Sequence, residues 1–73
     1  MLFNRREFDA CLALRDITID ELGLLSGLGK SKIYRRLKSN GKDFTLEEIE
    51  SIVSSAKFTI PETNRVFFNV LVA

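Results

Sequence analysis

The chain has 73 residues, of which 45% are hydrophobic and 29% are charged, and its formal net charge is +1. This length fits one domain, residues 1–73, with a small core, because a chain of this size buries only about 60% of its unfolded surface. A single cysteine and the absence of histidine exclude an internal disulfide, a Cys/His zinc site and His-based catalysis. No apolar run approaches the ~20 residues of a membrane span, and the charged N-terminal stretch is unlike a secretory signal.

Charge is unevenly distributed along the chain. Between residues 30 and 42 every charged side chain is basic, namely Lys30, Lys32, Arg35, Arg36, Lys38 and Lys42. Between residues 43 and 62 the balance reverses, with Asp43, Glu47, Glu48, Glu50 and Glu62 against Lys57. The sequence therefore predicts a basic surface beside an acidic one, although a net charge near zero is not typical of a strong nucleic-acid binder.

The first predicted helix begins at Asn4 and ends near Asp16. Asn4 is a good N-cap, and Glu7 stands three residues later, where its side chain can reach back to the N–H of the cap. The spacing of the apolar residues predicts a buried face formed by Phe8, Cys11 and Leu12. We expect Cys11 to be a small core residue rather than a reactive thiol.

The second predicted helix follows Thr18. Thr18 and Glu21 match the T-x-x-E capping box, and Leu22 and Leu25 are predicted to face the core. Gly23 lies inside this helix, where glycine costs about 1 kcal/mol relative to alanine. Its presence indicates that another helix passes too close for a side chain.

A glycine turn over residues 26–29 leads into the third predicted helix, from about Lys30 to Ser39. Gly27 suits a left-handed backbone conformation, and Ile33 and Leu37 are predicted to face the core. Residues 18–39 thus predict a helix-turn-helix, whose second helix can lie in the DNA major groove. The outer faces of that helix carry the candidate DNA-binding residues Lys30, Ser31, Lys32, Tyr34, Arg35 and Lys38.

The fourth predicted helix follows Thr45 and extends to about Ala56. Thr45 and Glu48 form another T-x-x-E capping box. Glu47 and Glu50 are predicted to lie on the solvent side. The apolar stripe is predicted to hold Leu46, Ile49, Ile52 and Val53.

Residues 58–72 allow two interpretations. A fifth helix beginning near Pro61, with Val66, Phe67 and Val70 on its buried face, is favoured. A β-hairpin around residues 61–64 is the alternative, because strand-forming residues flank them. Phe67 and Phe68 are adjacent, so in a helix they point about 100° apart. They either close the core with Phe3 or Phe8 or offer an aromatic anchor to a partner protein.

Taken together, the predicted elements indicate an all-α fold, a compact domain of four to five helices. Gly29, Lys30 and Ser31 could end a phosphate-binding loop, but Leu24 occupies the position of its first glycine. The acidic residues of the fourth helix are explained by capping and by the helix dipole. We therefore expect no catalytic residue, no metal site and no cofactor.

Thr18 to Gly41 resembles the lambda-repressor and Cro class of helix-turn-helix proteins. Gly23 stands at its small-residue position, Gly27 at its turn glycine, and Leu28 and Ile33 at its buried apolar positions. The chain departs from the class at Gly29, where a Ser or Thr cap is usual, and at Arg36, where an apolar residue is common. As a whole the chain is similar to small regulators of temperate phages of Gram-positive bacteria, which include Cro-like proteins and modulator-of-repression antirepressors.

The resemblance implies a transcriptional regulator of a phage lysis–lysogeny switch, acting in the host cytoplasm and not an enzyme. In the first hypothesis the protein is an antirepressor that binds the partner phage repressor and interferes with its operator binding. The candidate partner-binding residues are then Glu47, Glu50, Phe67 and Phe68. In the alternative hypothesis it is a Cro-like protein whose third helix binds operator double-stranded DNA directly. Neither hypothesis includes a membrane or a small-molecule substrate.

Overall fold

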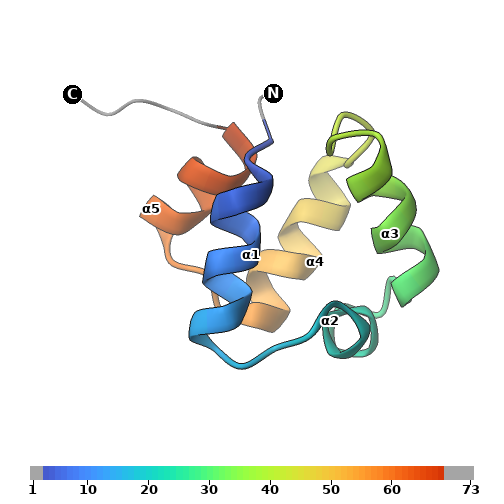
Figure 1. Cartoon of the computed structure of the whole chain (residues 1–73), viewed down its shortest axis with the longest axis horizontal. Helices are drawn as coiled ribbons and strands as arrows, with labels where there is room; N and C mark the ends of the chain where they lie inside the picture. Colours follow the sequence, from blue (N-terminus) through green and yellow to red (C-terminus); the bar gives the residue numbers. More distant parts are fainter. Residues whose placement is uncertain (1–2, 69–73) are drawn as a thin grey trace.

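The computed structural model describes residues 3–68, and within that range its regular elements are all helical. They are α1 (Arg5–Leu14), α2 (Ile19–Ser26), α3 (Lys30–Lys38), α4 (Leu46–Ala56) and α5 (Ile60–Thr63), which continues into the π-helical turn η1 (Asn64–Phe68). In Figure 1, α1 lies in front of α4, and α3 and α5 lie on opposite sides of this pair. None of the helices described is both long and apolar enough to cross a bilayer.

The all-α prediction is confirmed for residues 3–68, and the β-hairpin alternative is wrong. The reason is a third capping box, in which Thr59 Oγ1 accepts from the Glu62 N–H and Glu62 Oε1 accepts from the Thr59 N–H (2.8 Å). Pro61 occupies the first turn of α5, where its missing N–H costs nothing. A helix therefore begins where a hairpin turn was the alternative. Val70, predicted to be buried, lies outside the described residues.

The other two capping boxes begin α2 and α4, as predicted. Thr18 and Glu21 exchange two hydrogen bonds of 3.1 Å each, and Thr45 and Glu48 do the same. Each pair satisfies two backbone N–H groups that the helix start would otherwise leave without an acceptor.

The start of α1 differs from the prediction in one respect. Asn4 Oδ1 accepts from the Glu7 N–H (3.1 Å), but the Glu7 carboxylate does not return to the cap. It binds Arg65 of η1 instead (3.0 Å), and the Asn4 N–H donates to the carbonyl of Val66 (2.7 Å). The first helix is thereby tied to the last turn of the described chain.

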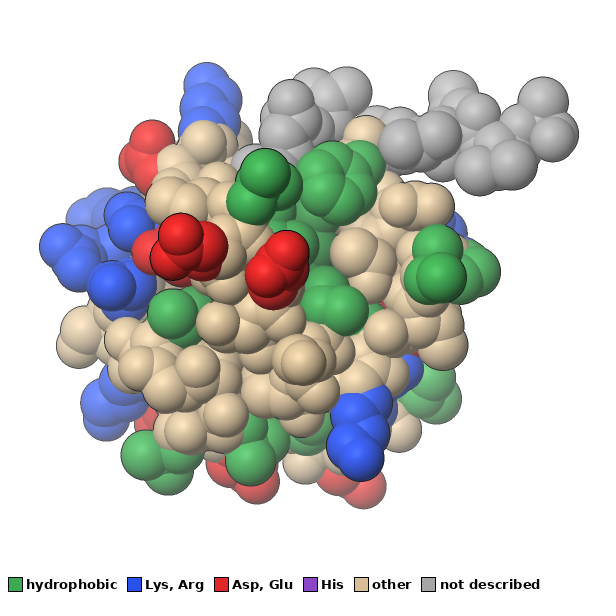
Figure 2. All heavy atoms as spheres, turned by 180° about the vertical axis from the view of Figure 1, so that it is seen from behind, with side chains coloured by type: hydrophobic (Ala, Val, Ile, Leu, Met, Phe, Trp, Pro, Cys, Tyr) green, Lys and Arg blue, Asp and Glu red, His purple; other side chains and the backbone are tan. Residues whose placement is uncertain are grey.

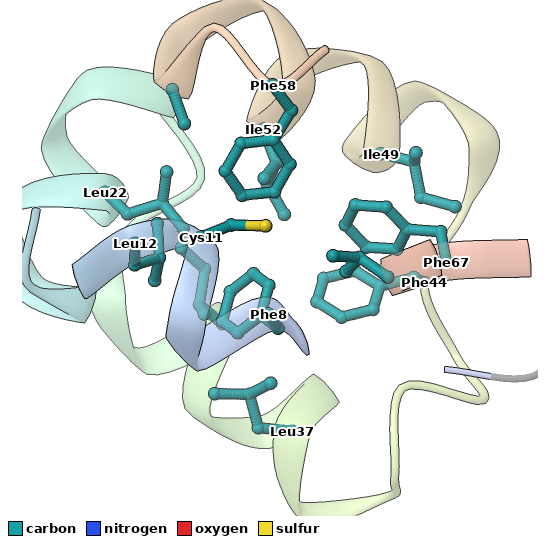
Figure 3. Packing of buried hydrophobic residues seen from close by; sticks show 13 residues of the cluster. Phe8, Cys11, Leu12, Leu22, Leu37, Phe44, Ile49, Ile52, Phe58 and Phe67 are labelled. Atoms are coloured by element: carbon teal, nitrogen blue, oxygen red, sulfur yellow. The ribbon is translucent and has the colours of Figure 1, made fainter. Parts of the chain in front are cut away.

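Phenylalanine rings fill much of the core (Figure 3). Phe67 is fully buried, and its ring centroid lies 5.7 Å from that of Phe44, 5.8 Å from that of Phe3 and 6.4 Å from that of Phe8. The prediction that Phe67 contacts a partner is therefore wrong, because a ring with no exposed surface cannot reach one. Cys11 is buried in the same cluster, as predicted.

Two leucines that were predicted to face the core are exposed. Leu25 is 57% exposed, because it lies beyond the edge of the buried face, about 60° from Leu22 on the side away from Gly23. Leu46 is 68% exposed, because it is the first residue of α4 and its side chain points back beyond the end of the core. The predicted burial of Leu22, Ile33, Leu37, Ile49 and Ile52 is confirmed.

Gly23 allows α2 and α3 to meet backbone to backbone. A Cβ atom built on Gly23 would lie 2.5 Å from the Lys30 nitrogen and 2.8 Å from the Gly29 carbonyl carbon. The close helix that the sequence indicated is thus the start of α3. Gly27 turns the chain between them with φ of +77°, a conformation that favours glycine.

Two partly buried ion pairs connect one helix to another. Arg15 donates to both oxygens of Glu62 (2.9 Å from Nη1 to Oε2) and also to the Lys57 carbonyl, so it joins the end of α1 to α5. Arg36 donates to both oxygens of Glu48 (3.0 and 2.9 Å), which joins α3 to α4. These bidentate contacts hold α3 and α5 in fixed positions.

Replacement of Gly23 by alanine is expected to destabilise the fold by up to about 2 kcal/mol. The clash with backbone atoms of Lys30 costs about 1–3 kcal/mol, which exceeds the roughly 1 kcal/mol gained in helix propensity. Urea denaturation measures the difference, and Leu25→Ala on the exposed side of the same helix serves as control. A Gly23→Ala variant as stable as the parent chain would contradict the close approach of the two helices.

Acid is expected to weaken the Arg15–Glu62 pair. Hydrogen bonds from Arg15, and then from the Thr59 N–H, lower the pKa of Glu62 from 4.5 to about 2. A lowered pKa gives stability that is complete above about pH 4.5 and is lost as the pH falls toward about 2. Glu62→Gln is expected to cost about 1–3 kcal/mol at neutral pH and to reduce this acid sensitivity in urea denaturation. If Glu62→Gln and the parent chain lose the same stability as the pH falls, the acid sensitivity does not come from the Arg15–Glu62 pair. Glu50→Gln, at an exposed carboxylate, is the control.

Candidate functional site

The outward face of α3 carries the side chains that the sequence predicted for DNA contact. Ile33 and Leu37 anchor the opposite face in the core. Five of the six predicted residues are exposed, and Lys32 is partly buried. The exposed five are Lys30, Ser31, Tyr34, Arg35 and Lys38.

Asp20 of α2 neutralises part of this face. Its Oδ2 atom lies 3.8 Å from Lys30 Nζ, and its Oδ1 atom accepts a hydrogen bond from the Tyr34 hydroxyl (3.3 Å). One carboxylate thus contacts two of the predicted DNA-binding side chains. Of the predicted cations, Lys32, Arg35 and Lys38 take part in no ion pair within residues 3–68.

Arg36 is paired with Glu48, so its charge does not add to the basic face of α3. The guanidinium lowers the pKa of the Glu48 carboxyl below its usual range, and the N–H of Thr45 lowers it further, while burial raises it. A carboxylate held ionised in this way keeps Arg36 paired at neutral pH. The sequence explained Glu48 as a capping residue, and this role is confirmed together with the unpredicted ion pair.

The start of α3 has no side-chain cap. Gly29 precedes the helix with φ of +86°, and it supplies no side-chain acceptor for the first-turn N–H groups. Such groups attract anions when no side chain satisfies them. The neighbouring anionic group is the carboxylate of Asp20, which pairs with the first residue of α3.

A second candidate surface is an apolar groove between α4 and η1. Its volume is about 460 Å³, and its walls are formed by Leu46, Ile49, Glu50, Val53, Ser54, Thr63 and Phe68. We call this the α4–η1 groove. Since α4 lies at the back in Figure 1, it faces the viewer in Figure 2, where hydrophobic side chains gather beside two acidic groups.

A more polar groove adjoins it along α4. Its volume is about 560 Å³, and its lining residues are Leu25, Ser26, Glu47, Glu50, Ser51, Ser54 and Ser55. Glu50 lines both grooves, and Glu47 lines the polar one. The structure therefore brings Glu50 and Phe68 to one groove and Glu47 next to it, and it places Phe67 in the core.

Sequence reasoning missed Leu46 and Asp20 as residues of these surfaces. Leu46 was assigned to the core by helical periodicity, although its place directly after the cap Thr45 was a signal for exposure. Asp20 sits in the first turn of α2, where an acidic residue is common for reasons of the helix dipole alone. Its contact with α3 depends on how the two helices pack, and no local pattern shows that.

Cys11 lies outside both candidate surfaces, and the acidic side chains of the described residues do not gather into a metal-binding cluster. Within residues 3–68, no group of three or more Cys, Asp or Glu side chains is placed to hold a metal ion. Burial, and then the nearby Glu62, raise the pKa of the Cys11 thiol. A buried thiol that stays protonated is a poor nucleophile. The two candidate surfaces are the basic face of α3, where Lys30 pairs with Asp20, and the apolar groove lined in part by Glu50.

Comparisons with known proteins identify no relative of this chain. No protein-family model matches the chain, and no curated protein and no solved structure is detectably similar to it.

Proposed function

We propose that this protein regulates transcription in a phage lysis–lysogeny switch by binding a partner repressor and hindering the operator binding of that repressor. The phage setting comes from the resemblance of residues 18–41 to the lambda-repressor and Cro class. The observation that carries the mode of action is the α4–η1 groove, which combines apolar lining residues with the carboxylate of Glu50 and lies beside Glu47 of the adjoining polar groove.

The apolar part of the groove suits protein recognition. Among the residues that line it, Leu46 is largely exposed, Phe68 is partly exposed and Ile49 is buried. Interfaces are typically centred on a few apolar or aromatic side chains that exclude water. A helix that presents one apolar side chain to this groove would bind in the helix-in-groove manner.

The acidic rim selects the kind of partner. Glu47 and Glu50 are exposed, and neither pairs with a cation within the described part of the chain. A repressor reads DNA with a basic surface. Carboxylates of the groove rim attract such a surface and speed its association. A repressor held there cannot place the same surface on its operator.

Direct operator binding is the second candidate function, and the exposed face of α3 favours it. Ser31 and Arg35 are exposed on that face, and a helix presented in this way can enter the major groove. Three cations without an ion pair give a modest phosphate-binding capacity, which corresponds to a salt slope near −2.7 at about −0.9 per contact. The Asp20 carboxylate on the same face opposes tight binding.

The groove is tested with the double variant Leu46→Ser and Glu50→Lys. Both side chains are exposed, so the fold is expected to persist, which circular dichroism checks. We expect the affinity for the partner repressor to fall at least about tenfold, because central interface residues carry about 1–2 kcal/mol or more each. Isothermal titration calorimetry measures the change.

The matched control is Leu14→Ser, because Leu14 is 78% exposed on α1 outside both grooves. A companion variant, Lys32→Ala with Arg35→Ala, distinguishes the two functions. If that variant abolishes regulation while the groove variant leaves it intact, direct DNA binding replaces the groove as the proposed function.

A further inference from the structure

The start of α2 shares a face with the start of α3, and this juxtaposition bears on DNA binding. Asp20 belongs to the first turn of α2, and its carboxylate contacts Lys30 in the first turn of α3 and Tyr34 one turn later. A pocket of about 340 Å³ lies between α2 and the start of α3, lined by Asp20, Leu24, Gly29 and Lys30.

A duplex that docks on α3 in the usual geometry meets both helix starts. In that geometry the N-terminal residues of the second helix approach the base edges, and the first helix crosses the phosphate backbone. Asp20 would then lie among phosphates, with 57% of its side chain exposed. Its charge would repel them, and Lys30 would have to leave Asp20 before it could bind a phosphate.

We propose that Asp20 is a residue that weakens the binding of the α3 face to DNA. It acts by neutralising Lys30, by holding the Tyr34 hydroxyl, and by repelling the phosphates that would approach the uncapped start of α3. The α3 face is therefore a nucleic-acid surface whose affinity one carboxylate suppresses. This inference goes beyond the proposed function and does not depend on the groove.

Other acidic side chains near α3 have different partners or positions. Glu21 is engaged in the capping box with Thr18, and Glu48 is paired with Arg36. Asp43 lies in a pocket with Arg35 and Lys38, toward the C-terminal end of α3 and away from the turn that approaches bases. Asp20 is the carboxylate placed at the start of that helix.

The test compares Asp20→Asn with the parent chain on a labelled random-sequence DNA duplex by fluorescence anisotropy. We expect Asp20→Asn to tighten binding about three- to tenfold at low salt, because a repulsive charge is lost and Lys30 is freed. The slope of log affinity against log salt is expected to steepen by about 0.9, the contribution of one additional phosphate contact. Adding Lys30→Ala to Asp20→Asn is expected to return the slope to that of the parent.

Asp9→Asn is the matched control. Asp9 pairs with Arg5 on α1 and is 52% exposed, so the substitution changes charge and breaks an ion pair to a similar extent without touching α3. The proposal is overturned if Asp20→Asn binds DNA no more tightly than Asp9→Asn, or if the salt slope does not change. Thr18, not Asp20, caps α2, so the fold is expected to persist. Asp20→Ser provides a second variant with the same expected outcome.

Repressor binding by the same variants separates this inference from the groove proposal. Asp20 does not line the α4–η1 groove, so Asp20→Asn is expected to bind the repressor like the parent chain. If the groove proposal fails in the repressor measurements, the DNA measurements on Asp20→Asn still test the role of Asp20. If the DNA measurements fail, the repressor measurements still test the groove.

Discussion

The direct backbone contact between Gly23 and the start of α3 is the constraint on which the arrangement of both surfaces depends. With no side chain at residue 23, the Lys30 nitrogen approaches α2 more closely than any Cβ would permit. This contact sets where α3 begins, and the insertion of Ile33 and Leu37 into the core sets how it is rotated. The cationic residues of α3 face outward as a consequence of core packing. The contact also brings the carboxylate of Asp20 within reach of Lys30.

Some charged side chains of the chain are held in ion pairs between helices, and others remain free at the surface of the described residues. Arg36 and Arg15 are each bound to a capping-box glutamate, so one capping box also connects α4 to the preceding helix α3 and another connects α5 to the distant end of α1. Lys30 is paired with Asp20, which leaves the basic face weaker than its composition indicates. Glu47 and Glu50 remain at the surface of α4, beside apolar side chains that the core does not cover. The two surfaces differ in chemistry and lie on different elements.

Much of the fold could be predicted from local patterns. The T-x-x-E boxes at Thr18 and Thr45 located two helix starts, and the cost of a helical glycine indicated the close approach at Gly23. The same box at Thr59 was present in the sequence, but strand-forming residues on both sides kept a hairpin as an alternative. Capping is the stronger signal here, because it satisfies specific backbone groups.

The remaining features depend on contacts between distant residues. Helical spacing orders side chains around a helix, but it does not say which neighbour covers each end, so Leu25 and Leu46 were wrongly assigned to the core. Whether Phe67 or Phe68 is buried depends on how η1 docks against Phe3, Phe8 and Phe44. The pairing of Asp20 with α3 likewise depends on packing, so the candidate site was predicted only in part.

Hydrogen–deuterium exchange of the full chain, alone and mixed with the repressor, tests the central claim most directly. If the α4–η1 groove binds the repressor, amides of residues 46–55 and 60–68 become protected, and those of residues 30–38 exchange as in the free protein. Protection confined to residues 30–38, or the same protection produced by operator DNA without repressor, would contradict the account.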